Sequence, residues 1–175
     1  MLALAYFFID LCLLRRKPQD LPASSALFGL VLGVALLGGL LLSISAGASV
    51  VAAVGQTLLD LLLMLAVLHL ALKALNKQAR YLQAATALVG ADAVIGLVAL
   101  LPVSLMRPVD TGAEPGGEMV FAGLLFLGLV VWSVLVVGHI LRHTFDLTLA
   151  QGVVIAIAFD VFSYVVISGL TQGAA

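Results

Sequence analysis

Three aspartates, Asp60, Asp92 and Asp160, stand inside the longest apolar stretches of the chain, where they could hold a proton or a cation. Each lies near the middle of its stretch, so in helices that cross a membrane the three would share roughly one depth. An acid at the centre of such a helix costs about 2.5–3.5 kcal/mol on insertion scales, and such residues usually face the interior of a bundle. The sequence therefore predicts an inward-facing acidic cluster.

Polar neighbours at helical spacing extend this predicted cluster. Gln56 precedes Asp60 by four residues and Tyr164 follows Asp160 by four, which puts each pair on one helical face. One interpretation is a proton or ion relay, or a polar substrate site, at the midplane. The other is a set of interhelical hydrogen bonds that joins helices with small-residue faces. We favour the hydrogen-bond interpretation because these stretches contain no lysine or arginine that could pair with the acids. Carboxylates lining a cavity open to water would favour the first.

His139 and His143 are four residues apart, and Asp146 follows three residues later. On a helix the two imidazoles would share one face, which makes them a candidate divalent-metal pair, with His69 as a further ligand. No glutamate stands between the histidines as in a zinc-protease motif. Contacts with lipid headgroups or helix caps are the simpler interpretation, and we expect no cofactor.

The composition requires that lipid surround most of this chain. Of its 175 residues 63% are hydrophobic and 10% charged, and the mean hydropathy is +1.26. Soluble domains carry about 25% charged residues. A helix needs about 20 apolar residues to cross a bilayer. Five stretches meet this length, so we predict an all-α bundle of five transmembrane helices: 27–46, 49–72, 82–106, 119–141 and 148–170.

Residues 1–26 form a separate segment before the predicted transmembrane domain, 27–170, and residues 171–175 form a short tail. The apolar part, 1–14, is too short to span comfortably and contains Asp10. We predict an interfacial or re-entrant helix here. A cleavable signal peptide, with 15–17 as its charged part and a cleavage site near Ala48, is the alternative. Its apolar region would exceed the usual length of about 7–15 residues.

The segments between the predicted spans are short. Ser24 and Ser25 are candidate caps for the first span. Residues 46–49 predict a tight turn and therefore an antiparallel hairpin of the first two spans. Residues 107–118, rich in proline, glycine and acid, predict a loop. Residues 142–147 predict a polar corner.

The eight basic residues are placed unequally across these spans. With five crossings, seven of them fall on one side and only Arg107 on the other. The positive-inside rule then puts the amino terminus in the cytoplasm and the carboxyl terminus outside, in an inner membrane if the source is bacterial. We expect the seven to contact headgroups: Arg15, Arg16, Lys17, Lys73, Lys77, Arg80 and Arg142.

Small residues recur at helix-packing spacing. Gly29, Gly33 and Gly39 in the first span and Gly152 in the fifth permit close helix approach, within the chain or between copies. Trp132 lies mid-span, away from the interfaces, so we expect it in the core. Cys12 is the only cysteine, which excludes an internal disulfide and a cysteine metal cluster.

Local sequence also resembles that of a known family. The segment 80–88 opens the third span and Pro102 lies near its end, Trp132 and 138–141 follow in the fourth, and Gly152 lies early in the fifth. Over 58–170 this pattern resembles the Yip (Ypt-interacting) family of five-span membrane proteins, in its compact bacterial branch. The resemblance implies five spans, a cytoplasmic amino terminus and no enzymatic activity. The chain lacks the long amino-terminal region of eukaryotic members, so a GTPase partner is not implied.

The sequence carries no catalytic signature: no nucleophile elbow, phosphate-binding glycine loop or dinucleotide fingerprint is present. The net charge of −1 gives no indication of nucleic-acid binding. We therefore expect a non-enzymatic protein that organises the membrane or partner proteins, including copies of itself, through helix packing. A small transporter or proton- or ion-coupled component that uses the three aspartates is the alternative.

Overall fold

A computed structural model describes residues 2–106 and 116–172, and throughout these ranges the regular structure is helical. Five helices are long and apolar enough to cross a membrane, and a short amino-terminal helix precedes them. The elements are α1 (Leu2–Cys12), a 3-10 turn η1 (Pro18–Asp20), α2 (Ser25–Ser45), α3 (Val50–Ala74), η2 (Gln78–Arg80), α4 (Tyr81–Leu105), α5 (Gly117–Phe145) and α6 (Leu149–Gln172). The chain thus has the fold of a polytopic membrane helical bundle, as the sequence predicts.

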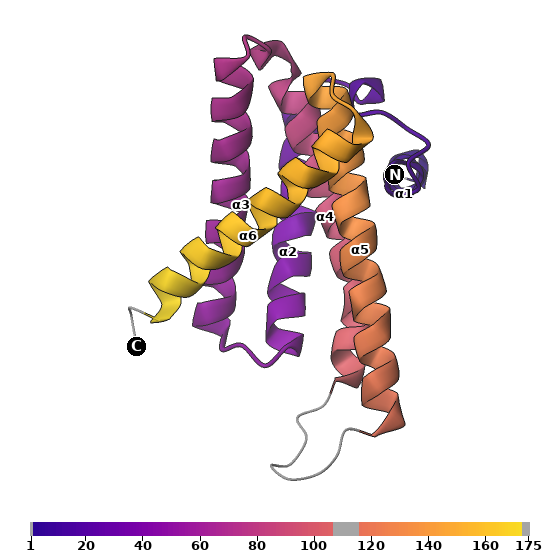
Figure 1. Cartoon of the computed structure of the whole chain (residues 1–175), viewed down its shortest axis with the longest axis vertical. Helices are drawn as coiled ribbons and strands as arrows, with labels where there is room; N and C mark the ends of the chain where they lie inside the picture. The colour runs from indigo at the N-terminus through magenta and orange to yellow at the C-terminus, as the bar shows by residue number, and fades with distance from the viewer. Residues whose placement is uncertain (1, 107–115, 173–175) are drawn as a thin grey trace.

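The ends of the helices follow from local chemistry. The hydroxyls of Ser24 and Ser49 accept hydrogen bonds from backbone nitrogens in the first turns of α2 and α3, both at 3.3 Å. Between these helices Gly47 has a φ of +91°, which glycine adopts without strain. α2 and α3 therefore form the predicted hairpin (Figure 1).

α5 continues beyond its predicted end and stops at Phe145. Basic side chains in its last turn, Arg142 and His143, suit the negative end of the helix dipole. Asp146 then takes a left-handed conformation that closes the helix. At its other end α5 begins at Gly117, so Glu118 lies in the helix rather than in the predicted loop. The remainder of that loop, 107–115, lies outside the described residues, as do 173–175 of the predicted tail; α6 runs to Gln172.

α4 is the central helix of the bundle. In its most apolar stretch 39% of the residues are buried, against 11–17% in the other four long helices. Its residues 84–91 are buried without interruption, and most of them are alanine, glycine or valine. Such small side chains allow α1, α2 and α5 to pack closely around α4.

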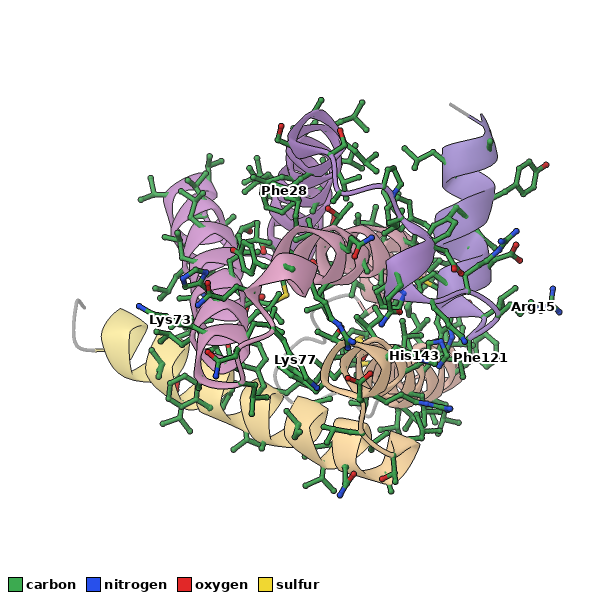
Figure 2. The ribbon with its side chains drawn as sticks, turned by 90° about the horizontal axis from the view of Figure 1, so that it is seen from above. Arg15, Phe28, Lys73, Lys77, Phe121 and His143 are labelled. Carbon is green, nitrogen blue, oxygen red and sulfur yellow. The ribbon has the colours of Figure 1, made fainter. Side chains whose placement is uncertain are left out.

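α1 does not run along the bundle. Figure 1 views it nearly end-on while the long helices lie lengthwise, and Figure 2, from above, shows it along its length. Its Phe8 ring occupies the space where a side chain at Gly90 of α4 would lie. Trp132 Nε1 of α5 donates a hydrogen bond to the Cys12 carbonyl, at 2.9 Å. This crosswise, docked position agrees with the prediction of a helix that does not span, and it gives Trp132 an anchoring contact besides its packing.

One end of the bundle collects three chain connections, and we call it the basic end: the segment 15–21, the α3–α4 connector with Lys77 and Arg80, and the α5–α6 corner with Arg142. Gln19 donates a hydrogen bond to the His143 carbonyl, and Gln83 donates one to the Leu21 carbonyl at 2.7 Å. The α2–α3 turn lies at the opposite end (Figure 1).

Candidate functional site

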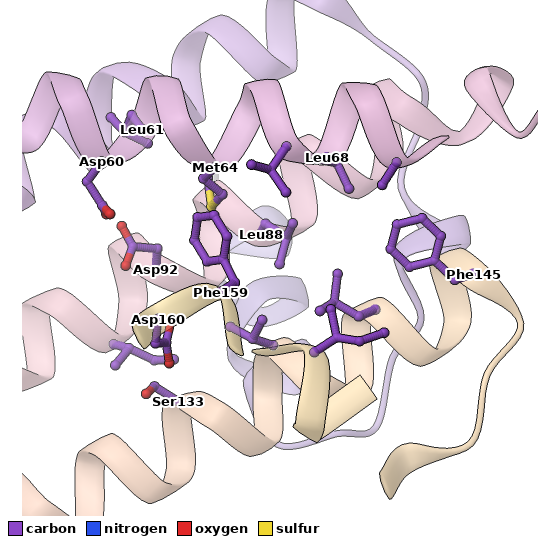
Figure 3. Close-up of a pocket in the computed structure, with 16 residues that line it drawn as sticks. Asp60, Leu61, Met64, Leu68, Leu88, Asp92, Ser133, Phe145, Phe159 and Asp160 are labelled. Atoms are coloured by element: carbon purple, nitrogen blue, oxygen red, sulfur yellow. The ribbon is translucent and has the colours of Figure 1, made fainter. Parts of the chain in front are cut away.

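Asp60, Asp92 and Asp160 come together in the structure. They lie on α3, α4 and α6, each near the middle of its helix, and all three line one cavity of about 180 Å³ (Figure 3). The carboxylates of Asp60 and Asp92 point toward each other across it. Each of the three residues keeps accessible surface and contributes to the lining of this cavity. The structure thus brings together the three acids that the sequence places near the middle of their helices.

The walls of this first cavity are otherwise apolar. Ser133 of α5 is the polar exception, and its hydroxyl donates to the Val130 carbonyl in its own helix. The apolar lining comes from four helices: Leu61, Met64, Val67, Leu68, Ala71, Leu88, Ile95, Val137, Leu141, Phe145, Ile155 and Phe159.

A second cavity, of about 300 Å³, lies on the other side of the same acids. It has more polar lining, with Ser43, Gln56 and Thr57. Among the described residues, those that line both cavities are Asp60, Leu61 and Asp92. The Asp60–Asp92 pair therefore stands where the two spaces meet.

The two cavities extend in opposite directions along the bundle. On α3, which runs toward the basic end, the first cavity continues from Asp60 to Ala71, and the second continues back to Gln56. On the antiparallel α4 the first cavity reaches back to Leu88, toward the basic end, and includes Ile95 just beyond Asp92, while the second includes Gly96. The first cavity thus reaches toward the basic end and the second toward the opposite end.

A hydrogen bond links the acids to α6. Ser163 Oγ donates to Asp60 Oδ1 at 2.6 Å, and the serine is only 5% exposed. Within the described residues, ion pairs with lysine or arginine involve Asp10 and Asp146 and none of the three acids. A charge on these carboxylates is therefore left without a fixed cation in apolar surroundings, which favours uptake of a proton or a mobile cation.

Two predicted members of the cluster lie elsewhere. Gln56 lines the second cavity only, and Tyr164, 74% exposed, lines neither. The reason is that α6 crosses the bundle obliquely (Figure 1), so its row of every fourth residue leaves the interface after Asp160. Ser163, seven residues after buried Ala156, continues the inner face instead. Its spacing of three from Asp160 was the signal that could have found it.

The proposed metal ligands have other partners. The rings of His139 and His143 are in edge contact, 4.7 Å between centroids, but His139 Nε2 donates to the Arg16 carbonyl at 2.9 Å. Asp146 is held by Lys77 and Arg80. His69 stacks edge-on with Tyr81. The described part of the chain holds no group of three metal-binding side chains, so the metal-site prediction gains no support.

Lys77 and Arg80, expected at lipid headgroups, instead hold the α5–α6 corner. Lys77 Nζ lies 2.9 Å and Arg80 2.8 Å from the Asp146 carboxylate. They also donate to the carbonyls of Phe145 and Thr144, which end α5. These contacts hold the pKa of the Asp146 carboxyl below its ordinary value. Among the other predicted headgroup contacts, Arg15, Arg16, Lys17 and Lys73 are exposed and Arg142 is half-buried.

The predicted packing glycines divide into two groups. A side chain at Gly39 would lie 2.8 Å from Thr57, and one at Gly152 would overlap the Gly138 carbonyl oxygen, so both mark close helix crossings. Gly29 and Gly33 have no neighbour within 4 Å. Packing at these two remains a prediction about a partner outside the chain.

Comparison with family models, curated proteins and solved structures finds no match to this chain. The resemblance to the Yip family therefore stays a prediction from the residues quoted above. The structure itself places the chain in the class of five-helix bundles, which is compatible with an integral membrane protein.

Proposed function

We propose that this chain is a small membrane transporter or coupling component in which Asp60 and Asp92 take up a proton or a small cation between two cavities. The observation that carries the proposal is the position of these two residues in the lining of both cavities, one directed to each end of the bundle. Accessible intramembrane carboxylates are typical of ion and proton paths.

The arrangement suggests how each residue contributes. A carboxylate reached from the basic-end cavity exchanges its proton or cation with its neighbour, and the second cavity connects that neighbour to the other side. Asp160 adds a third acid beside the first cavity. By the positive-inside rule we assign the basic end to the cytoplasm, in a bacterial inner membrane. No covalent chemistry is needed, consistent with a non-enzymatic protein.

Proton flux into liposomes tests this proposal. The purified chain is reconstituted with a pH-sensitive dye inside, and a potassium diffusion potential drives protons inward. We expect flux from the wild-type chain, and loss of it when Asp60, Asp92 and Asp160 are all replaced by asparagine with helical content unchanged. Asp10→Asn, outside the cavities, is the matched control. Repeating the assay with sodium or potassium gradients separates proton from cation uptake. Equal flux of all these ions in the triple variant and the wild type would contradict the proposal.

A role in organising partners or copies of the chain is a second candidate, favoured by Gly29 and Gly33 of α2, where an added side chain would meet no atom of this chain within 4 Å. Close packing against another helix would use such a surface. Cross-linking in membranes tests it: Gly33→Leu should remove a cross-linked species that wild type forms. If wild type forms none, this candidate is wrong.

A further inference from the structure

α6 is attached firmly at one end only. Near the basic end it crosses α5 at Gly152, whose backbone lies so close to Gly138 that a side chain at either position would meet the backbone of the other helix. Gly152 and Ala156 are buried there. Glycine pairs of this kind let two helix backbones approach closely, and here the Val153 side chain of α6 lies against Gly138 of α5.

Beyond the crossing, α6 is mostly unpacked. Val161, Tyr164 and Val165 are 58%, 74% and 60% exposed. Ser163 is the buried residue of the stretch 161–168 and is bonded to Asp60 of α3, and Val166, Ile167 and Ser168 are half-buried. The distal half of α6 is thus connected to α3 through the same carboxylate that lines both cavities.

This helix also covers the acids. Ile155, Phe159 and Asp160 of α6 form part of the wall of the first cavity, and Ile167 forms part of the second. Figure 1 shows α6 running obliquely from α5 across to α3, and Figure 3 shows Phe159 and Asp160 beside Asp60 and Asp92. A swing of its distal half away from α3 would widen both spaces.

We infer that α6 is the gate of this site, with its pivot at Gly138–Gly152 and its latch at Ser163–Asp60; this inference rests on the proposed function. A hydroxyl bonds more strongly to an ionised carboxylate than to a neutral one. When Asp60 takes up a proton or a cation, the serine loses its strong acceptor and the latch weakens. Occupancy of the site is thereby coupled to the position of α6.

Two other acids influence how readily Asp60 takes up a proton or a cation. Asp92 faces it from α4 and Asp160 lies on α6, and both repel a charge on Asp60 when they are ionised. The cavity-lining residues of α2 and α5 in the described ranges carry no titratable group. Ionised Asp92 and Asp160 therefore favour the loaded form of Asp60 and with it the weak latch, whereas loading of Asp92 or Asp160 removes this repulsion.

Distances between spin labels test the gate in the reconstituted chain. With Cys12→Ala as background, one label pair joins exposed positions of α3 and α6, Leu62→Cys and Val165→Cys. A second pair, Leu135→Cys on α5 and Val154→Cys on α6, reports on the region of the pivot. Ser163→Ala should lengthen and broaden the α3–α6 distance by several ångströms and leave the pivot pair unchanged. Ser163→Thr, which keeps the hydroxyl, should resemble wild type.

An unchanged α3–α6 distance in Ser163→Ala would overturn the gate. If that variant fails to fold, acidification of the labelled wild type replaces it: the distance should lengthen as pH falls and should no longer respond in Asp60→Asn, and a constant distance would overturn the gate. Flux separates the two proposals. Loss of flux in Asp60→Asn with no distance change would reject the gate and keep the transport function. Distance changes without any flux in wild type would reject transport.

Discussion

Adding one methyl group at Gly152 should weaken the bundle, because that atom has no space. The Cβ of Gly152→Ala would overlap the Gly138 carbonyl oxygen, and it would lie 3.1 Å from the carbonyl carbon and 3.2 Å from the Arg142 nitrogen. All three are backbone atoms of α5, which cannot rotate away as the end of a side chain can. The two helices must separate instead.

The loss of stability in Gly152→Ala is measured relative to the same substitution at a matched glycine. Gly128 of α5 is also in a helix interior and has no neighbour within 4 Å. Alanine is favoured over glycine in helices by about 1 kcal/mol, and this gain is common to both substitutions. The difference between Gly152→Ala and Gly128→Ala is therefore the overlap alone, about 1–3 kcal/mol of unfolding free energy.

Equilibrium unfolding in mixed detergent micelles, followed by circular dichroism, measures this difference. We expect Gly128→Ala at or above wild-type stability and Gly152→Ala below it. If Gly152→Ala is as stable as Gly128→Ala, the close α5–α6 crossing is refuted, and with it the pivot assigned to α6.

Two further predictions concern the docked segments. Lys77 and Arg80 lower the pKa of Asp146 below its usual 3.8, so the ion pair stabilises the fold above that pH and is lost as pH falls through the lowered value. When thermal stability is measured at decreasing pH, wild type should show an extra loss below about pH 4 that is missing in Asp146→Asn. Identical curves for the two proteins would contradict the contact. Burial raises the pKa of the Cys12 thiol to about 11, so a maleimide at pH 7.5 should label folded protein far more slowly than protein unfolded in SDS. As a control, Asn76→Cys in a Cys12→Ala chain should be labelled quickly in both states. Rapid labelling of folded wild type would show that α1 is not docked.

The apolar stretches of the sequence and the local signals at their ends predict most of this fold. Five apolar stretches, the cap at Ser24 and the tight turn at 46–49 are local signals, and each is confirmed. The cap at Ser49 was not predicted. The meeting of Asp60, Asp92 and Asp160 was also predictable, since mid-helix acids avoid lipid.

Features that depend on how helices cross were not predictable. The oblique course of α6 excludes Tyr164 from the cavities and brings Ser163 to Asp60, although positions three and four residues after Asp160 are both on its helical face. Phe8 packs on Gly90, and Trp132 donates a hydrogen bond to Cys12. These contacts join residues about 80 and 120 positions apart, and a single sequence carries no signal that such distant residues meet. The same holds for Lys77 and Arg80 on Asp146.

Sided labelling of the two cavities tests the central claim most directly. In a Cys12→Ala chain, Met64→Cys lies in the first cavity and Thr57→Cys in the second, with the Asp60–Asp92 pair between them. A membrane-impermeant thiol reagent is applied to sealed vesicles of either orientation. The account predicts that the first cysteine is labelled from the side of the basic end and the second from the opposite side. Labelling of both from the same side, or of neither from any side, would contradict it.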